Sequence, residues 1–150
     1  LVDTYPIQNI RDRRKWKECV SRFSECSIYD GIVDLIQYCR SKNLKIGVVT
    51  NSVSYYSTSL LKYFSIPYDY LISYHDTVNH KPLSDPVIKC LDSLGLCSSS
   101  VVAVGDSSAD YHSYSSLKIF SIGAGWNPFL ETPESWDVVY TNPRDVIKKL

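Results

Sequence analysis

The stretch from residue 100 to residue 110 constrains the fold more than any other part of the sequence. Its apolar run has the length of a buried strand and ends in Gly105-Asp106, and Asp110 follows near the expected start of a helix. In an open α/β sheet, ligands bind outside the carboxyl ends of the strands, so these carboxylates are expected at the edge of a crevice. The pair suits a hard divalent cation, although an aspartate at such a junction is often only a turn or capping residue.

The composition fits a single soluble domain. The chain has 150 residues, of which 44% are hydrophobic and 21% are charged, and this is enough to bury a sizeable core. Its formal net charge is zero, and the basic run at residues 11–17 is interpreted as a solvated helix face rather than a phosphate site. We therefore expect no nucleic-acid partner and no membrane partner, and no apolar stretch is long enough to span a bilayer.

The five cysteines are an odd number and include no Cys-x-x-Cys pair. Because they are scattered through predicted helices, we expect small, buried, apolar thiols in a reducing compartment, which favours the cytoplasm. Three histidines do not lie at zinc-ligand spacing with them, so zinc is not expected. These residues are Cys19, Cys26, Cys39, Cys90 and Cys97, and His75, His80 and His112.

Helical and strand patterns alternate along the chain. Runs that are apolar at consecutive positions, such as residues 45–50, are typical of parallel strands covered on both faces. The alternation predicts one α/β domain with a parallel sheet. We expect helices at residues 9–27, 31–43, 53–64, 85–94, 111–117 and 143–150, and strands at residues 45–50, 68–73, 100–105, 118–123 and 137–141.

Two further polar segments stand where chemistry is expected. Thr50 and Asn51 end a predicted strand and offer a hydroxyl, an amide and backbone N–H groups to an anionic oxygen, or they cap the next helix. Lys81 lies in a polar loop, where Pro82 fixes its direction. A lysine in an exposed loop is usually only a solvated charge, so the neighbouring motifs carry the functional interpretation.

In this order, the three segments resemble motifs of the haloacid dehalogenase-like (HAD) hydrolase superfamily, in its phosphatase branch of phosphoglycolate phosphatase-like proteins. Residues 47–52 resemble its second motif, residues 80–87 its third and residues 104–110 its fourth. The similarity runs from Gly31 to about Trp126, and Ser84 stands where the family often has proline. The resemblance implies an α/β, three-layer Rossmann-like fold with a parallel sheet.

The resemblance also implies a chemistry, which is hydrolysis of a phosphomonoester through an aspartyl-phosphate intermediate with Mg²⁺ as cofactor. Thr50 would donate its hydroxyl to a phosphoryl oxygen, Asn51 would orient the substrate, and Lys81 would offset negative charge. Asp106 would bind Mg²⁺, and Asp110 would complete the metal site by holding Lys81 or a metal-bound water. Magnesium is preferred to zinc because every candidate ligand is an oxygen.

The family's first motif, Asp-x-Asp-x-Thr, which carries the nucleophile, is absent from this sequence. Residues 1–4 resemble the segment that follows this motif in the family, so the nucleophile would lie seven positions before Asp3. In the family's sheet, its strand lies between the strands that end here at Thr50 and Asp106. Without that middle strand, two rows of backbone groups would lack partners. The chain also has no methionine, and we expect the biological protein to carry this strand upstream of Leu1.

Residues 5–28 are long enough only for a small helical cap segment. A small cap suggests an open site for a large substrate or a site completed by a partner chain, and a small phosphorylated molecule is favoured over a protein as substrate. The side chains available to line the site are Tyr55, Tyr56, Tyr111, His112 and Tyr114, although packing explains most of the tyrosines.

Two alternatives to a phosphatase remain open. One is a non-catalytic HAD-fold binding or regulatory protein that lacks the nucleophile. The other is a different doubly wound protein, for which the sequence lacks a Gly-rich phosphate fingerprint.

Overall fold

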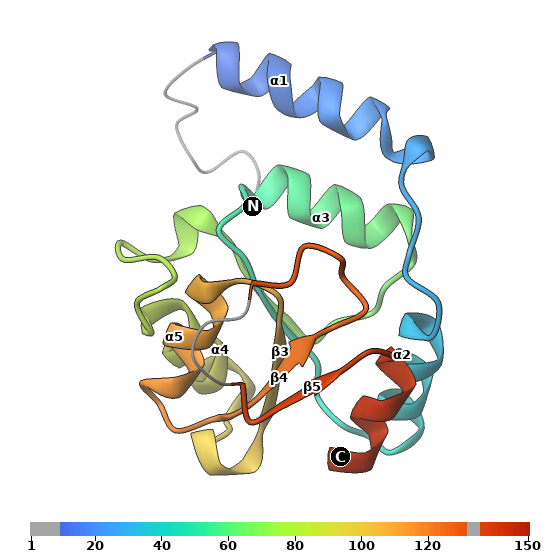
Figure 1. Cartoon of the computed structure of the whole chain (residues 1–150). Coiled ribbons are helices and arrows are strands. Elements are labelled where there is room, and N and C mark those ends of the chain that lie inside the picture. The colour runs from blue at the N-terminus through green and yellow to red at the C-terminus, as the bar shows by residue number, and fades with distance from the viewer. Residues whose placement is uncertain (1–9, 132–135) are drawn as a thin grey trace.

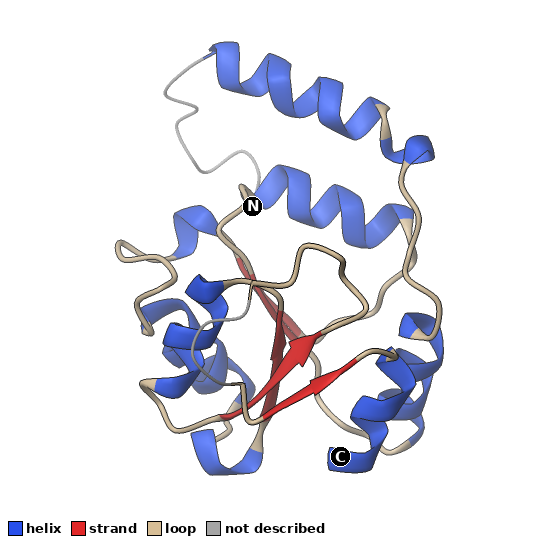
Figure 2. Ribbon diagram, in the orientation of Figure 1, coloured by secondary structure: helices blue, strands red, loops and turns tan. Residues whose placement is uncertain are grey.

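The computed structural model describes residues 10–131 and 136–150, and the side chains from residue 16 onward within them. Residues 5–9 of the predicted cap segment therefore lie outside the described part. Within the described residues, five strands form two parallel sheets, one with the order β1-β2 and one with the order β3-β4-β5 (Figure 2). The strands are β1 (Gly47–Val49), β2 (Tyr70–Ile72), β3 (Val102–Gly105), β4 (Phe120–Ala124) and β5 (Val138–Tyr140).

All three strand pairs are parallel, as predicted. In the first sheet Val49 is opposite Ile72, and in the second Gly105 is opposite Gly123. Because the strands run the same way, their carboxyl ends lie at one edge of each sheet, where the polar motif residues follow.

Helices alternate with the strands along the chain. The α-helices are α1 (Ile10–Ser21), α2 (Ile32–Ser41), α3 (Ser54–Tyr63), α4 (Asp85–Leu94) and α5 (Ser108–Ser115). The 3₁₀ helices are η1 (Phe23–Glu25), η2 (Tyr74–Asp76), η3 (Ser98–Ser100) and η4 (Pro143–Lys149).

The helices cover both faces of the strands, with α4 and α5 on one side and α2 and η4 on the other (Figure 1). The first layer has a buried cluster formed by Val87, Tyr114, Ile119 and Trp136. The second has a cluster formed by Leu35, Ile122 and Val146. Burying apolar side chains on both faces is the main stabilising contribution in such a fold. The structure confirms the predicted three-layer α/β fold class.

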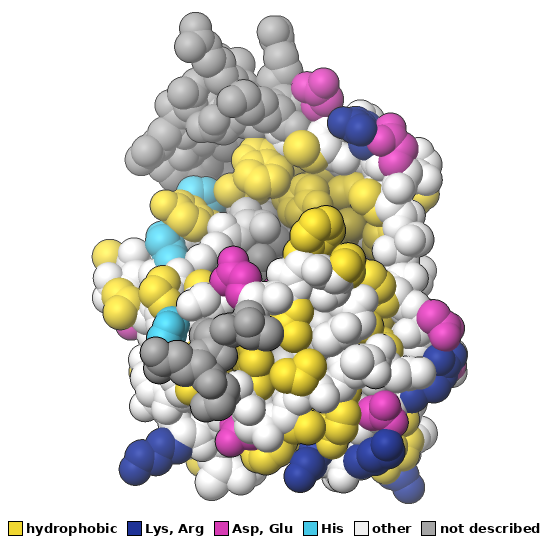
Figure 3. Space-filling model, in the orientation of Figure 1, with side chains coloured by type: hydrophobic (Ala, Val, Ile, Leu, Met, Phe, Trp, Pro, Cys, Tyr) yellow, Lys and Arg dark blue, Asp and Glu magenta, His cyan; other side chains and the backbone are white. Residues whose placement is uncertain are grey.

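Aromatic side chains attach α1 and η1 to α3. The ring centroids of Trp16 and Tyr56 lie 5.1 Å apart and those of Phe23 and Tyr56 lie 5.5 Å apart. Phe23 is only 3% exposed, so its ring anchors the segment. On the face shown in Figure 3, hydrophobic side chains gather between the region of α1 and the domain below it. The α-helix predicted to run to residue 27 ends at Ser21 and continues as a separate 3₁₀ turn.

Capping explains where two helices begin and end. In α5, the Ser107 hydroxyl accepts a hydrogen bond from the Asp110 N–H, and the Asp110 carboxylate bonds back to the Ser107 N–H, which is a capping box. This box starts the helix at Ser108 rather than at the predicted residue 111. Gly95 closes α4 with a φ of 66°. By contrast, α3 begins after Val53 without a side-chain cap.

The expectation of buried cysteines is wrong for three of them. Cys90 is buried and Cys39 is half-buried, but Cys19, Cys26 and Cys97 are exposed. Cys19 and Cys26 belong to the α1–η1 segment, which covers α3 with one face only, and Cys97 lies in the turn after α4. Within the described residues, no helix has the length and apolar character needed to cross a membrane.

Candidate active site

Lys81 lies at the centre of the candidate site. Its ammonium group donates a hydrogen bond of 2.9 Å to the backbone carbonyl of Val49 and one of 2.5 Å to Oδ1 of Asp110. The side chains of the ion pair are only 10% and 9% exposed. A buried ammonium with two oxygen partners is held in one place, so Lys81 is not a solvated loop charge.

The Asp110 carboxylate uses both of its oxygens inside the protein. While Oδ1 accepts from Lys81, Oδ2 accepts from the Ser107 hydroxyl at 2.8 Å and from the backbone N–H groups of Ser107 and Asp106 at 3.2 and 3.3 Å. Burial alone would raise the pKa of Asp110, but the charge of Lys81 and these hydrogen bonds outweigh it and lower that pKa. Asp110 is therefore an ionised residue that fixes Lys81 and the start of α5.

Gly105 permits this close packing. A Cβ atom at position 105 would lie 2.5 Å from Cβ of Asp110, which is closer than real side chains approach. Only glycine lets β3 end directly against the Asp110 side chain. This contact gives a physical reason for the Gly-Asp-x-x-x-Asp spacing that the sequence showed.

Asp106 points its carboxylate outward. The residue is exposed, and its Oδ2 accepts a hydrogen bond of 2.5 Å from the side-chain amide of Asn127. Within the part of the chain that the structure describes, no hydrogen-bond donor contacts Oδ1. An exposed carboxylate oxygen without a protein donor is available to a cation.

Thr50 and Asn51 follow β1 and are arranged differently from each other. The Thr50 hydroxyl oxygen accepts from the Ser52 N–H at 3.0 Å, which leaves its own O–H free to donate. The Asn51 amide instead bonds to both polar backbone groups of Lys81, with N···O distances of 2.9 and 3.2 Å. Asn51 therefore holds the Lys81 loop, and its predicted contact with substrate stays a prediction.

Hydrogen bonds link the predicted site residues into one group. Lys81 binds the carbonyl of Val49, the residue before Thr50, and its partner Asp110 binds the N–H of Asp106. The structure thus brings three separate sequence motifs to one edge of the fold. The roles of Asp106 and Asp110 at a metal stay predictions.

The tyrosines proposed to line the site mostly pack instead. Tyr114 is 7% exposed and donates to the carbonyl of Val104 at 3.2 Å, and burial raises its pKa far above the ordinary value. Tyr111 packs edge-on against Trp136, with ring centroids 5.6 Å apart. Tyr56 packs against α1, so all three rings contribute to packing, and their contact with a substrate stays a prediction.

Two residues of the site were missed by the sequence analysis. Asn127 bonds to the Asp106 side chain, and Glu131 bonds through its N–H to the Asp106 carbonyl at 2.8 Å. The Glu131 carboxylate also accepts from the Ser108 N–H at 2.6 Å. In the sequence their segment is predicted only as a long loop, because Asn127 precedes a proline and no motif marks it.

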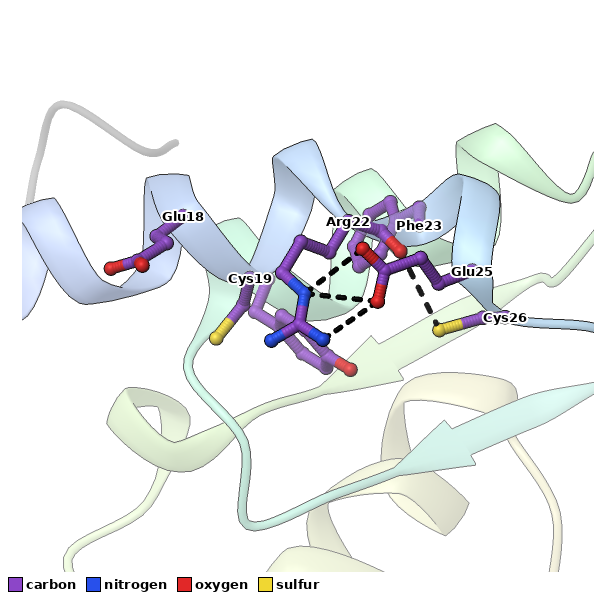
Figure 4. Close-up of a pocket in the computed structure, with 7 residues that line it drawn as sticks. Glu18, Cys19, Arg22, Phe23, Glu25 and Cys26 are labelled. Atoms are coloured by element: carbon purple, nitrogen blue, oxygen red, sulfur yellow. Dashed lines mark hydrogen bonds and ion pairs between the residues drawn. The ribbon is translucent and has the colours of Figure 1, made fainter.

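A separate pocket of about 490 Å³ lies beside α1 and η1 (Figure 4). Across it, the Arg22 guanidinium pairs with the Glu25 carboxylate at 2.6 Å. Among the residues considered for the site, only Tyr56 lines this pocket. The pocket therefore does not belong to the group of residues around Lys81.

The fold and the site together define a Rossmann-like α/β protein with a charged site at the carboxyl edge of its strands. The chain belongs to the family of haloacid dehalogenase-like hydrolases, which it matches over residues 3–124. This match confirms the resemblance drawn from the three motifs.

Relatives and solved structures agree with this membership. Phosphoglycolate phosphatase of Escherichia coli is 26% identical over 133 residues, which cover 82% of this chain and 51% of that protein. A Clostridium perfringens protein provisionally named pyrophosphatase PpaX is 34% identical over 92 residues, 57% of this chain and 41% of that protein. The chain thus spans about half the length of these relatives.

The fold likeness extends over nearly the whole chain. The crystal structure of a protein from Lactobacillus plantarum, provisionally named phosphoglycolate phosphatase, superposes with a TM-score of 0.81 at 20% identity. The superposition covers 93% of this chain and 68% of that chain. At this identity the likeness establishes the fold alone.

Proposed function

We propose that the protein is a Mg²⁺-dependent phosphatase that hydrolyses a phosphomonoester through an aspartyl-phosphate intermediate. The observation that carries this proposal is the buried Lys81, held between Asp110 and the carbonyl of Val49, the residue before Thr50. Within the described residues the Thr50 hydroxyl donates to no acceptor. A fixed cation and a hydroxyl donor at the end of the same strand suit the negative oxygens of a transferring phosphoryl group.

The chain's own residues would act on that group as follows. The Thr50 hydroxyl donates to one phosphoryl oxygen, and the Lys81 ammonium offsets the charge of the phosphoryl group and its acceptor. An aspartate nucleophile, which the described residues do not supply, would form a bond to phosphorus as the ester P–O bond breaks and the leaving oxygen gains a proton to depart as the alcohol. Water would then displace the aspartate, which leaves a free carboxylate and inorganic phosphate. Asn51 and Asp110 keep Lys81 in place during both steps.

Asp106 fits the metal that the family implies. Its exposed Oδ1 is a hard oxygen donor, the kind that Mg²⁺ prefers. Within the described residues, no group of three or more His, Cys, Asp or Glu side chains could hold a metal, so Asp106 alone among them is proposed as a carboxylate ligand. Bound Mg²⁺ would neutralise charge on the phosphoryl oxygens.

The gap between the two sheets supports a further strand that carries the nucleophile. Among the described strands, β1 pairs only with β2 and β3 only with β4. Because the Thr50 N–H bonds to β2, the neighbouring Val49 backbone faces away from β2, toward this gap. Val49 and Ala103 nevertheless pack against the same buried cluster, so both sheets rest on the α4–α5 layer. A strand placed between them would pair the backbone groups of both open edges, apart from the Val49 carbonyl, which already accepts from Lys81.

The substrate we propose is a small phosphorylated molecule, handled in the cytoplasm. The names of the relatives, phosphoglycolate phosphatase and pyrophosphatase, both denote enzymes of small phosphorylated compounds.

Phosphate release from para-nitrophenyl phosphate by the full-length protein tests the function. We expect turnover that requires Mg²⁺, stops with EDTA and falls at least about 100-fold in Asp106→Asn. Asp92→Asn, which neutralises an exposed aspartate of α4, is the matched control and keeps wild-type rates. A folded full-length protein without turnover would favour the non-catalytic alternative.

A further inference from the structure

We propose that Asn127 is a positioning residue that orients Asp106 for Mg²⁺, and that Tyr29 in turn holds Asn127. The inference rests on the proposed function, and it assigns residues outside the three motifs to the metal site. The chain of contacts runs from the Tyr29 hydroxyl to Oδ1 of Asn127 at 3.2 Å, and from Nδ2 of Asn127 to Oδ2 of Asp106 at 2.5 Å.

Two donors fix which way the Asn127 amide faces. Its Oδ1 accepts from the Tyr29 hydroxyl and also from the backbone N–H of Phe129 at 3.0 Å. An amide whose oxygen already has two donors must present its NH₂ group on the other side, toward Asp106. Asn127 is therefore a donor of fixed direction.

This donor leaves one oxygen of Asp106 for the metal. The NH₂ group binds Oδ2 and stops the carboxylate from rotating, while Oδ1 faces outward without a donor from the described residues. A neutral amide adds no positive charge that would compete with Mg²⁺. Holding a metal-binding carboxylate through its other oxygen lowers the entropy lost when the metal binds.

A second connection keeps Asn127 at the correct distance. Glu131, four residues later, bonds through its N–H to the Asp106 carbonyl at 2.8 Å and through its carboxylate to the Ser108 N–H at 2.6 Å. The loop after β4 is thus joined to the loop after β3 at three points. Asn127 cannot move away from Asp106 unless these bonds break.

Tyr29 connects this arrangement to another part of the chain. It lies between η1 and α2, in the segment that leads from α1 into the domain, and it is 46% exposed. Its contact with Asn127 joins positions 98 residues apart. The link makes the geometry of Asp106 depend on the position of that segment.

Direct measurement of Mg²⁺ binding by titration calorimetry on the full-length protein tests the inference. We expect Asn127→Ala to raise the Kd for Mg²⁺ about 10- to 100-fold. Tyr29→Phe, which removes only a hydroxyl, should raise the Kd severalfold. Tyr70→Phe removes a hydroxyl that has no hydrogen bond within the described residues, and it should leave the Kd unchanged. Circular dichroism and thermal melts show whether each variant stays folded.

The outcomes separate this inference from the proposed function. If Asp106→Asn loses Mg²⁺ while a folded Asn127→Ala keeps the wild-type Kd, the metal site stands and the inference is overturned. If the wild type binds no Mg²⁺, or Asp106→Asn binds it normally, the proposed metal role and the inference both fail.

Discussion

The Asn51 side chain and the main chain of Lys81 form two hydrogen bonds that join the end of β1 to a loop thirty positions later. The amide both donates to the Lys81 carbonyl and accepts from its N–H, so it pairs with the main chain of Lys81 as a neighbouring strand would. Lys81 is therefore fixed at its main chain as well as at its buried ammonium group.

Replacing Asn51 should impair turnover more than folding. We expect Asn51→Ala to cost about 1–3 kcal/mol of unfolding free energy, since each hydrogen bond contributes about 0.5–1.5 kcal/mol. Turnover should fall at least tenfold because Lys81 loses its fixed loop. Asn79→Ala removes one side-chain bond to Asp85 in the same loop and should keep its turnover. Urea unfolding and initial rates check both; equal rates in the two variants would contradict the positioning role.

Breaking the Lys81–Asp110 pair should destabilise the protein strongly. Lys81→Met leaves a buried carboxylate without its cation, and we expect a loss of about 3–5 kcal/mol in unfolding free energy. The double variant Lys81→Met/Asp110→Asn should lose less than the sum of the single variants. A double-mutant cycle from urea unfolding measures this coupling, and strict additivity would show that the contact has no energetic role.

The lowered pKa of Asp110 predicts acid sensitivity. A carboxylate whose folded pKa is below its ordinary value of 3.8 adds stability above that pH, and this stability is lost as the pH falls through the folded pKa. Urea unfolding between pH 7 and pH 2 should therefore show a steeper decline below about pH 4 in the wild type than in Asp110→Asn. Asp30 and Asp69 also have lowered pKa values, so only the difference between the two proteins reports on Asp110. Parallel curves would refute the assignment.

A methyl group at position 105 should push Asp110 away. Gly105→Ala places a Cβ within 2.5 Å of the Asp110 side chain, and overpacking of this kind costs about 1–3 kcal/mol. Gly95→Ala is the control, because its Cβ meets nothing within 4 Å and its only cost is the positive φ, about 1 kcal/mol. Only Gly105→Ala should also reduce turnover. Equal turnover in both variants would mean that the close approach has no part in the site.

The exposed Cys97 should be the most reactive of the cysteines whose pKa is shifted. Hydrogen bonds with the side chains of Ser100 and Ser99 lower its pKa to about 7, whereas burial raises the pKa of Cys90 to about 11. Iodoacetamide labelling, followed by peptide mass spectrometry, should show Cys97 modified faster than Cys90, with a rate that rises through about pH 7. Ser100→Ala should slow the labelling of Cys97 at neutral pH. Faster labelling of Cys90 would disprove the prediction.

Local signals predicted much of the fold. Helix α4 matches its expected range of residues 85–94, because Pro86 marks its first turn and Gly95 its end. Consecutive apolar residues predicted parallel strands, and the pairing of β3 with β4 confirms this. These features depend on residues close in sequence, which is why the sequence alone was sufficient.

Features that depend on distant contacts were not predictable. The α1–η1 break occurs where Phe23 turns inward to contact α3, and helical periodicity does not show such a contact. Asn127 contacts Asp106, 21 positions away in the sequence, and Tyr29, 98 positions away. No sequence motif includes Asn127 or Tyr29, and the motif that includes Asp106 does not indicate either contact. Likewise, the motif placed Asn51 at the site, but only the folded chain shows that its amide holds Lys81.

The two helices that begin at the site edge differ in electrostatic character. The first turn of α5 is occupied by carboxylates, since Asp110 closes the capping box and Glu131 accepts from Ser108. The first turn of α3, directly after Thr50 and Asn51, has no acidic residue and no side-chain cap. The positive end of a helix dipole attracts anions only where it is not already neutralised. In the proposed reaction, this local field would favour the phosphoryl group near α3 and the cation near α5, so the two ions would be directed to different helices.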